Sequence, residues 1–394
     1  MKRKLRTIAG MLLLAIPLSM NAQVHPTKNE DKTPKTVTLK AEKPNRETTP
    51  DAKAPQDPKK PSLMPKISGL VQGLYQGDFD KEMALEKNTF RLRRVRMYID
   101  GSLFKGLTYR IQGDFIRKPM LVDAYLKYKA CDAFAIQIGQ FKTPFTIETL
   151  INPVNLEIYD YGEDIQKLGG YSDICGVGAI GRDIGIMATG QLFPVQDQAN
   201  GAYSIVEYSL GLFNGNGINV IDNNNRKDLV GRLDVHPGMK HLTLSGSYYH
   251  GYYTSETSHG LRNRWAAGAQ YNDGALVLRS EYVSGRTGFL SESLNAENVP
   301  ALSADTLHSN GYYAVAGYNF KFGKQGKEQT LMPVVRYEHF ANDRDDTGNC
   351  YNYYTVGLNY WPLKSVNIKL DYSLIQQGDN IHAHRVVGLL SYKF

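Results

Sequence analysis

The chain has 394 residues, of which 42% are hydrophobic and 22% charged, and its formal net charge is +7. The excess positive charge is N-terminal. Residues 1–22 hold 4 basic residues, and residues 23–65 hold 9 basic and 6 acidic residues. The remaining residues, 66–394, hold 33 basic and 33 acidic residues. Because that long segment is neutral and has no basic stripe interleaved with stacking aromatic residues, the composition argues against nucleic-acid binding.

The first 22 residues have the three parts of a secretory signal peptide. Four basic residues precede the apolar run Ile8 to Leu18, and Met20-Asn21-Ala22 is suited to cleavage before Gln23. The apolar run contains Pro17 and is shorter than the roughly twenty residues that a membrane-spanning helix needs. Since no later run is long enough either, we expect an exported chain that can cross a membrane only as a closed β-barrel.

Residues 23–65 are predicted to be a disordered linker in the periplasm. They are rich in Lys, Pro, Thr, Glu and Asp and contain no aromatic residue, so they cannot bury enough apolar surface to offset the entropy of ordering. We interpret the segment as a spacer; contact with anionic periplasmic polymers is the alternative.

From residue 66 to the C-terminus, segments of about ten residues alternate apolar and polar side chains, and Gly, Asn, Asp and Pro clusters separate them. This pattern predicts an all-β fold, a transmembrane antiparallel β-barrel of about 16 strands over 66–394. The predicted strands are 66–77, 89–103, 106–117, 121–130, 133–142, 181–193, 202–213, 227–236, 240–253, 262–272, 275–286, 309–322, 330–341, 350–361, 365–377 and 384–394.

The connections between these strands alternate between short and long, as expected for short periplasmic turns and long external loops. The exceptions are a short outer link near Lys118 and longer inner links at 194–201 and 323–329. The longest connection, 143–180, is the third external loop.

The inward faces of the strands are expected to line water and to carry charges of both signs. Residues two apart on one face are about 7 Å apart, so we expect opposite charges to neutralise each other along the wall. The pairs are Arg110 with Asp114, Arg232 with Asp234, Arg279 with Glu281, Arg336 with Glu338, and Lys369 with Asp371.

The segment Phe90 to Met97 departs from this balance, since it holds four arginines and no acid. Its apolar residues change parity, which predicts a β-bulge near Arg93 and Arg94 that turns every arginine inward. We interpret the cluster as anion-attracting, because guanidinium groups suit phosphate and carboxylate; pairing with Asp114 and Asp123 is the alternative. The anion-attracting pore residues are predicted to be Arg91, Arg93, Arg94, Arg96 and Arg110.

Four phrases of the sequence resemble the phosphate-selective porins O and P of bacterial outer membranes. They lie at 90–115, 123–128, 136–148 (IQIGQFKTPFTIE) and 181–186 (GRDIGI). The cleavage site and the Tyr-rich, Asn-rich barrel are similar to the Bacteroidetes branch. The resemblance implies a sixteen-stranded, trimeric channel in the outer membrane whose inward Arg and Lys residues pass anions such as phosphate.

In trimeric porins the third external loop folds into the lumen, which makes 143–180 the expected constriction loop. Its acids outnumber its bases and it has no lysine cluster, so we expect a field between arginines on the wall and carboxylates on the loop, with weakened anion selectivity. The charged residues predicted to act at this constriction are Lys142, Glu148, Glu157, Asp160 and Lys167.

The C-terminal strand ends in Tyr392 and Phe394 on one face. This pattern resembles the signal by which the outer-membrane insertion machinery recognises unfolded barrels, so we expect that machinery, outer-membrane lipid and small hydrophilic or anionic solutes as partners.

The sequence favours a passive diffusion porin without cofactor, metal or catalytic residues. An outer-membrane enzyme of the lipase or protease type is one alternative, for which Ser245, Ser247 and His250 on one strand are the available side chains. A non-conducting structural or adhesive barrel is the other. The cysteines Cys131, Cys175 and Cys350 are expected to be thiols, with a Cys175–Cys350 disulfide as the alternative.

Overall fold

A computed structural model describes residues 64–79, 87–177, 180–197, 201–254, 259–294, 300–346, 348, 350–378 and 381–394. The predicted signal peptide and all but the last two residues of the predicted linker lie outside this part of the chain. Among the described residues, no helix is long and apolar enough to cross a membrane.

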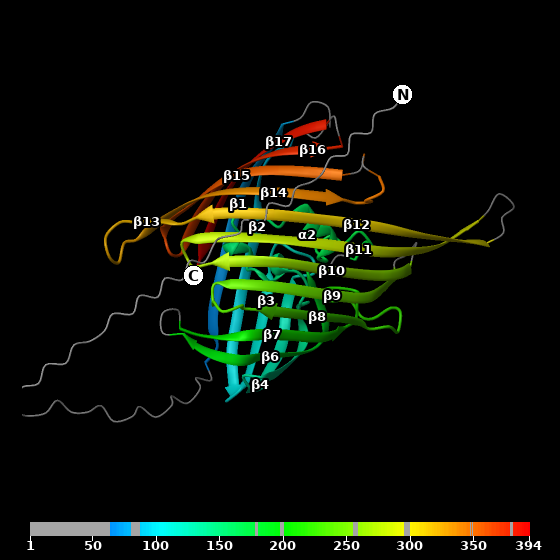
Figure 1. Ribbon diagram of the computed structural model, residues 1–394, viewed down its shortest axis with the longest axis horizontal. Helices are drawn as coiled ribbons and strands as arrows, with labels where there is room; N and C mark the ends of the chain where they lie inside the picture. The colour runs from blue at the N-terminus through cyan, green and yellow to red at the C-terminus, as the bar shows by residue number, and fades with distance from the viewer. Residues whose placement is uncertain are drawn as a thin grey trace, which may run out of the picture. The chain divides into compact units, whose positions relative to one another are not determined.

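The described residues form a single closed antiparallel sheet in which each strand pairs with the next (Figure 1). β12 and β13 are one strand interrupted at Asn319, because both pair with β14, so sixteen strands close the barrel and the predicted count is confirmed. The strands are β1 (Lys66–Phe79), β2 (Lys87–Phe104), β3 (Leu107–Asp114), β4 (Leu121–Cys131), β5 (Phe134–Lys142), β6 (Arg182–Asp197), β7 (Gly201–Phe213), β8 (Asp228–Val235), β9 (Leu242–Thr254), β10 (His259–Asn272), β11 (Leu276–Leu294), β12 (Pro300–Tyr318), β13 (Phe320–Phe322), β14 (Gln329–Ala341), β15 (Cys350–Leu363), β16 (Val366–Gln377) and β17 (Ile381–Lys393).

The first and last strands close the barrel. β1 pairs with β17 from Leu70 opposite Lys393 to Phe79 opposite His384. Beyond β17, the Phe394 N–H donates to Gly69 O at 3.2 Å, and Gly69 N donates to Phe394 O at 2.9 Å. The Phe394 ring lies over Gly69, where a Cβ would be 2.1 Å from the ring, so the terminal aromatic residue packs where a side chain is missing.

Alternation along the strands separates an apolar exterior from a polar interior. On β15, Val356 is 54% exposed on the outside, whereas Thr355 and Asn359 on the inside are 5% and 0% exposed. Aromatic rings on neighbouring strands, such as Tyr337 and Tyr354 with centroids 5.1 Å apart, contact one another on the outer face. This is the pattern of a wall between lipid and water.

A β-bulge occurs in β2 where the sequence predicts one. Gln72 of β1 lies opposite Arg94 while Gly73 lies opposite Leu92, which leaves Arg93 as the extra residue. Phe90 and Leu92 on one side of the bulge and Met97 on the other are all exposed on the outer surface. The shift in parity thus keeps the apolar side chains toward lipid, where an arginine at mid-depth would cost ~2–4 kcal/mol.

Some predicted loops are strands that extend beyond the expected ends. β11 reaches Leu294 and β12 begins at Pro300, so most of the predicted loop 287–308 is a hairpin. On the inner side, β6 and β7 remain paired to Asp197 and Gly201, which corrects the predicted link 194–201. Hydrogen bonds between paired strands satisfy the backbone N–H and C=O groups outside a membrane as well as within it, so strand pairing continues past the apolar span.

The third external connection, between β5 and β6, folds into the lumen, as expected. It contains α1 (Ile147–Leu150), the 3₁₀ turn η1 (Pro153–Asn155) and α2 (Glu163–Leu168), and Figure 1 shows α2 within the ring of strands. Thr146 Oγ1 caps α1 by accepting from Thr149 N at 3.2 Å. The loop forms an apolar core with inward residues of the wall, including Leu156, Ile165 and Leu168 from the loop and Val283, Tyr313 and Val334 from the wall.

Candidate functional site

The internal loop is held by carboxylates that contact arginines of the barrel wall. Glu148 Oε2 accepts from Arg336 Nη1 at 2.7 Å on β14, and Glu157 accepts from Arg279 on β11, with one contact of 3.1 Å. These side chains are at most 8% exposed. Charge-assisted hydrogen bonds of this kind are short and directional, so they fix the loop against the β11–β14 wall.

Arg336 lies at the centre of a cluster of buried carboxylates. Besides Glu148, its guanidinium contacts Glu338 at 3.2 Å and Asp164 at 3.8 Å, and it stacks over the Tyr313 ring with Cζ 4.1 Å from the centroid. Its single positive charge lies among three carboxylates, two of which belong to the loop. Burial, together with Glu338 and Glu148, raises the pKa of Asp164 despite the opposing effect of Arg336.

Asp160 anchors the other side of the loop to the bulged strand β2. Its carboxylate pairs with Arg93 and accepts from Arg94 Nη2 at 2.9 Å. Burial disfavours the ionised carboxylate, but Arg93 and Arg94 outweigh it and lower the Asp160 pKa to about 2. The bulge therefore has a structural consequence, because it brings two consecutive arginines to one loop carboxylate.

Backbone groups of the loop also bond to the wall. Lys369 donates to Ile158 O at 3.2 Å and also to Leu156 O. Asp371 accepts from Tyr159 N at 2.7 Å, and Ile147 N donates to Glu281 at 2.6 Å. Much of the charge predicted for mutual neutralisation within the wall therefore serves to hold the loop.

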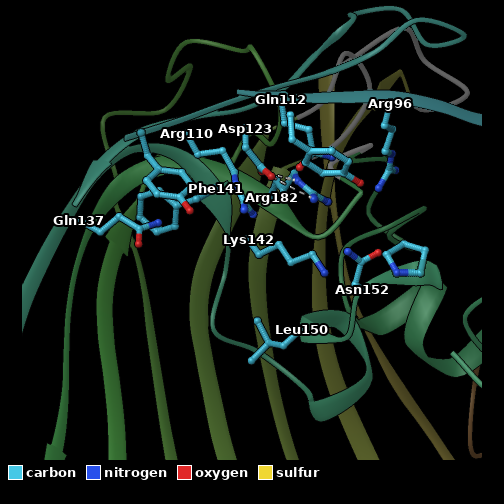
Figure 2. Close-up of a pocket in the computed structure, with 13 residues that line it drawn as sticks. Arg96, Arg110, Gln112, Asp123, Gln137, Phe141, Lys142, Leu150, Asn152 and Arg182 are labelled. Atoms are coloured by element: carbon cyan, nitrogen blue, oxygen red, sulfur yellow. Dashed lines mark hydrogen bonds and ion pairs between the residues drawn. The ribbon is translucent and has the colours of Figure 1, made fainter. Parts of the chain in front are cut away.

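A pocket of about 220 Å³ lies between the β2–β6 wall and the α1–η1 part of the loop. In Figure 2, Arg110 and Asp123 lie on the opposite side of this space from Leu150 and Asn152, and Lys142 extends into it. The lining residues are Arg96, Tyr98, Arg110, Gln112, Asp123, Tyr125, Gln137, Phe141, Lys142, Leu150, Asn152, Pro153 and Arg182.

The four cations of the pocket have different partners. Arg96 pairs with Asp114 at 2.9 Å, Arg110 with Asp100 at 2.7 Å and Arg182 with Asp123 at 2.6 Å. Lys142 differs, since its ammonium donates to the carbonyls of Thr149 and Ile151 at 2.6 and 3.0 Å. Asp123 is the one carboxylate named in the lining, and Asp114 and Asp100 pair with lining arginines, so the four cations and their three carboxylate partners leave one net positive charge, that of Lys142.

The structure divides the five predicted arginines among three places. Arg96 and Arg110 line the pocket. Arg93 and Arg94 bind the loop through Asp160, and Arg91 donates to Gln76 Oε1 at 3.0 Å. All five point inward, but the alternative of simple pairing is realised for Arg96 with Asp114.

Two of the five predicted wall pairs are confirmed and two are wrong, and in the fifth Lys369 and Asp371 each bond to the backbone of the loop instead of to each other. Arg232 with Asp234 (2.8 Å) and Arg336 with Glu338 (3.2 Å) form as expected. Arg110 instead pairs with Asp100, which lies directly opposite it on the neighbouring strand, because such a cross-strand partner is closer than Asp114, four residues along the same strand. Arg279 pairs with Glu157, because the loop fills the space in front of it.

The predicted loop residues occupy positions that the sequence did not show. Of the five, Lys142 lines the pocket, while Glu148, Glu157 and Asp160 are buried against wall arginines. Lys167 lies 3.8 Å from Glu163 on α2. The expected field between separated loop carboxylates and wall arginines is therefore wrong, because these opposite charges are in contact.

Sequence reasoning missed the uncharged part of the pocket and the role of Arg182. Tyr98 shares the inward parity of Arg94 and Arg96 beyond the bulge, and Tyr125 is two residues from Asp123. Parity alone would have placed both rings inward. Nothing in the sequence shows that the loop would approach them.

The side chains considered for hydrolysis are not assembled. Ser245 and Ser247 are buried on the inward face of β9, whereas His250 has the opposite parity and contacts Asn263 at 2.8 Å. Cys175 is a buried thiol rather than part of a disulfide, and burial raises its pKa to about 12.

Comparison with known proteins agrees with the fold. The model of the phosphate-selective porin O and P family matches residues 67–388. No curated protein sequence matches the chain significantly. Similar solved structures include an anion-selective porin from Comamonas acidovorans, with 12% identity, TM-score 0.58 and coverage of 84% of this chain and 99% of that chain.

Two further structures cover the same share of this chain. The outer membrane channel DcaP of Acinetobacter baumannii is 13% identical, with TM-score 0.57 and 97% of that chain covered. OmpT of Vibrio cholerae in a trimer form is 11% identical, with TM-score 0.53 and 99% of that chain covered. At these identities the likeness establishes the barrel fold alone.

Proposed function

The chain belongs to the phosphate-selective porin O and P family, and from that premise we propose that it is an outer-membrane porin for passive diffusion of small hydrophilic solutes with a preference for anions such as phosphate. The observation that carries the proposal is the pocket beside the internal loop, which has four cations and one carboxylate in its lining. A cleft in which one sign of charge predominates raises the local concentration of the opposite ion.

The loop carboxylates support this preference by their position. They bind the β11–β14 wall and the bulge of β2, so the part of the loop that faces the pocket presents Leu150, Asn152 and Pro153 instead. An ion in the pocket therefore meets Arg96, Arg110, Lys142 and Arg182 without an acidic loop opposite them.

A lipase or protease activity is less well supported, because Ser245 and His250 are on opposite faces of β9. A structural or adhesive barrel would be recognised by the absence of ion conductance in planar bilayers. Neither alternative explains why cations converge on one side of the internal loop.

We also propose that three copies associate and that Tyr392 and Phe394 are read by the insertion machinery before the barrel closes. The trimer form of the Vibrio cholerae relative supports the first part. Light scattering of the protein purified in mild detergent should give the mass of three chains, and a mass of one chain would contradict it.

Neutralising Lys142 tests the charge of the pocket. We expect Lys142→Met to lower the chloride-to-potassium permeability ratio roughly threefold, because a unit charge about 10 Å from a permeating ion contributes ~1–2 kcal/mol at an effective dielectric constant of 20 before salt screening. Reversal potentials under a potassium chloride gradient in planar bilayers measure the ratio.

The matched control is Lys324→Met, which removes the same charge from the turn between β13 and β14, away from the pocket residues. The chloride-to-potassium permeability ratio of Lys324→Met should equal that of the unmodified protein. If Lys142→Met also leaves the reversal potential unchanged, the pocket does not select ions.

A further inference from the structure

We propose that the pocket binds organic anions that carry a flat apolar group, with aromatic carboxylates as the substrate class. The inference rests on the proposed anion-conducting function and deepens it. It says which anions should bind best among those of equal charge.

The apolar part of the lining points to such a ligand. Tyr98, Tyr125 and Phe141 enter the pocket from the wall, and Leu150 and Pro153 enter from the loop. A hydrated inorganic anion gains nothing from these five side chains. Binding sites for organic molecules, in contrast, combine apolar walls with a few placed polar groups.

The ring of Tyr125 is held in a fixed orientation. It meets Phe141 edge to face, with centroids 6.0 Å apart and an interplanar angle of 80°, and Phe141 meets Phe213 in the same way at 5.5 Å. Phe141 and Phe213 are 2% and 0% exposed, so the stack is anchored in the wall. A planar ligand would pack on it as another aromatic ring does.

Two hydrogen-bond donors remain for the anionic end of the ligand. The Lys142 ammonium has three N–H groups and uses two of them on Thr149 O and Ile151 O. Gln112 is 2% exposed, and its Nε2 donates to no partner in the part of the chain that the structure describes. A buried amide without an acceptor costs free energy, and a ligand carboxylate would supply that acceptor.

The size of the space fits one ring. An engineered cavity of about 150 Å³ holds benzene, and the pocket measures about 220 Å³. The additional volume accommodates a carboxylate.

Block of the chloride current measures binding independently of ionic mobility. Potassium benzoate and potassium acetate, which share one charge and one carboxylate, should be added separately to channels conducting chloride in planar bilayers. We expect half-block by benzoate at a concentration about five times lower than by acetate, the advantage that one aromatic contact provides.

Removing the aromatic lining should abolish that difference. In Tyr125→Leu, and independently in Tyr98→Leu, the two half-block concentrations should converge. The matched control is Tyr128→Leu, which removes a tyrosine from the outer face of the same strand and should keep the fivefold difference. Two independent variants guard against one that fails to assemble.

The outcomes separate this inference from the proposed function. Equal block by benzoate and acetate in a channel that prefers chloride to potassium overturns the aromatic-anion inference alone. A channel that shows no preference for chloride overturns the proposed function. Block by inorganic phosphate with no difference between the carboxylates would identify the pocket as a site for the charge only, which also contradicts the inference.

Discussion

Replacing Arg336 by methionine is expected to free the internal loop and to destabilise the barrel by roughly 3–5 kcal/mol, the range for removing one partner of a buried ion pair. Arg336 is 1% exposed on its side chain and is the cation that contacts Glu148, Asp164 and Glu338. Methionine fills a similar volume but leaves these buried carboxylates without a cation. The loop would leave the wall to hydrate them.

Two measurements check this expectation. Thermal unfolding in detergent should occur at a lower temperature, and single-channel conductance should increase because the loop no longer narrows the lumen. Arg344→Met is the control, since Arg344 is 58% exposed and lies 3.8 Å from the exposed Asp345. Ion pairs between exposed side chains contribute little to the free energy of unfolding. Unchanged stability and conductance in Arg336→Met would show that the apolar core alone holds the loop.

Replacing Asp160 by asparagine should destabilise the protein at neutral pH but not in strong acid. The Asp160 pKa falls from its ordinary 3.8 to about 2 because Arg93 and Arg94 outweigh the effect of burial. A lowered pKa stabilises the folded state fully above pH 3.8, and this stabilisation is lost as pH falls toward about 2. The shift corresponds to roughly 2 kcal/mol.

The measurement is the difference in unfolding free energy between Asp160→Asn and the unmodified protein across this pH range. It should be largest at neutral pH and become small near pH 2. Asp132→Asn is the control, because Asp132 is 82% exposed in the turn after β4. A difference that stays constant with pH would mean that Asp160 contributes through its shape rather than its charge.

The wall of the barrel could be predicted from the sequence because the alternation of apolar and polar residues within each strand identifies its lipid face and its inward face. Alternation along 350–361 identifies the lipid face without knowledge of its neighbours. The same rule placed the bulge at Arg93, since four arginines and the apolar residues around them cannot all be accommodated in an unbroken strand.

The lumen could not be predicted in the same way. The contacts that position the loop join residues far apart in the chain, as Glu148 with Arg336 and Glu157 with Arg279 do. Nothing local marks Arg336 as the partner of Glu148 in addition to Glu338, two residues away. The number of acids in the loop therefore indicated a charged constriction. In the structure, those acids pair with arginines of the wall and attach the loop to it.

The pairing of Leu70 with Lys393 means that the ring is complete only when β17 is present beside β1. A product truncated before Ile381 would leave β1 and β16 with open backbone edges, which hydrocarbon cannot solvate. We expect such a fragment to have no stable form in a membrane. Closure of the sheet at the β1–β17 seam therefore makes the stability of the whole cylinder depend on its two outermost strands in chain order.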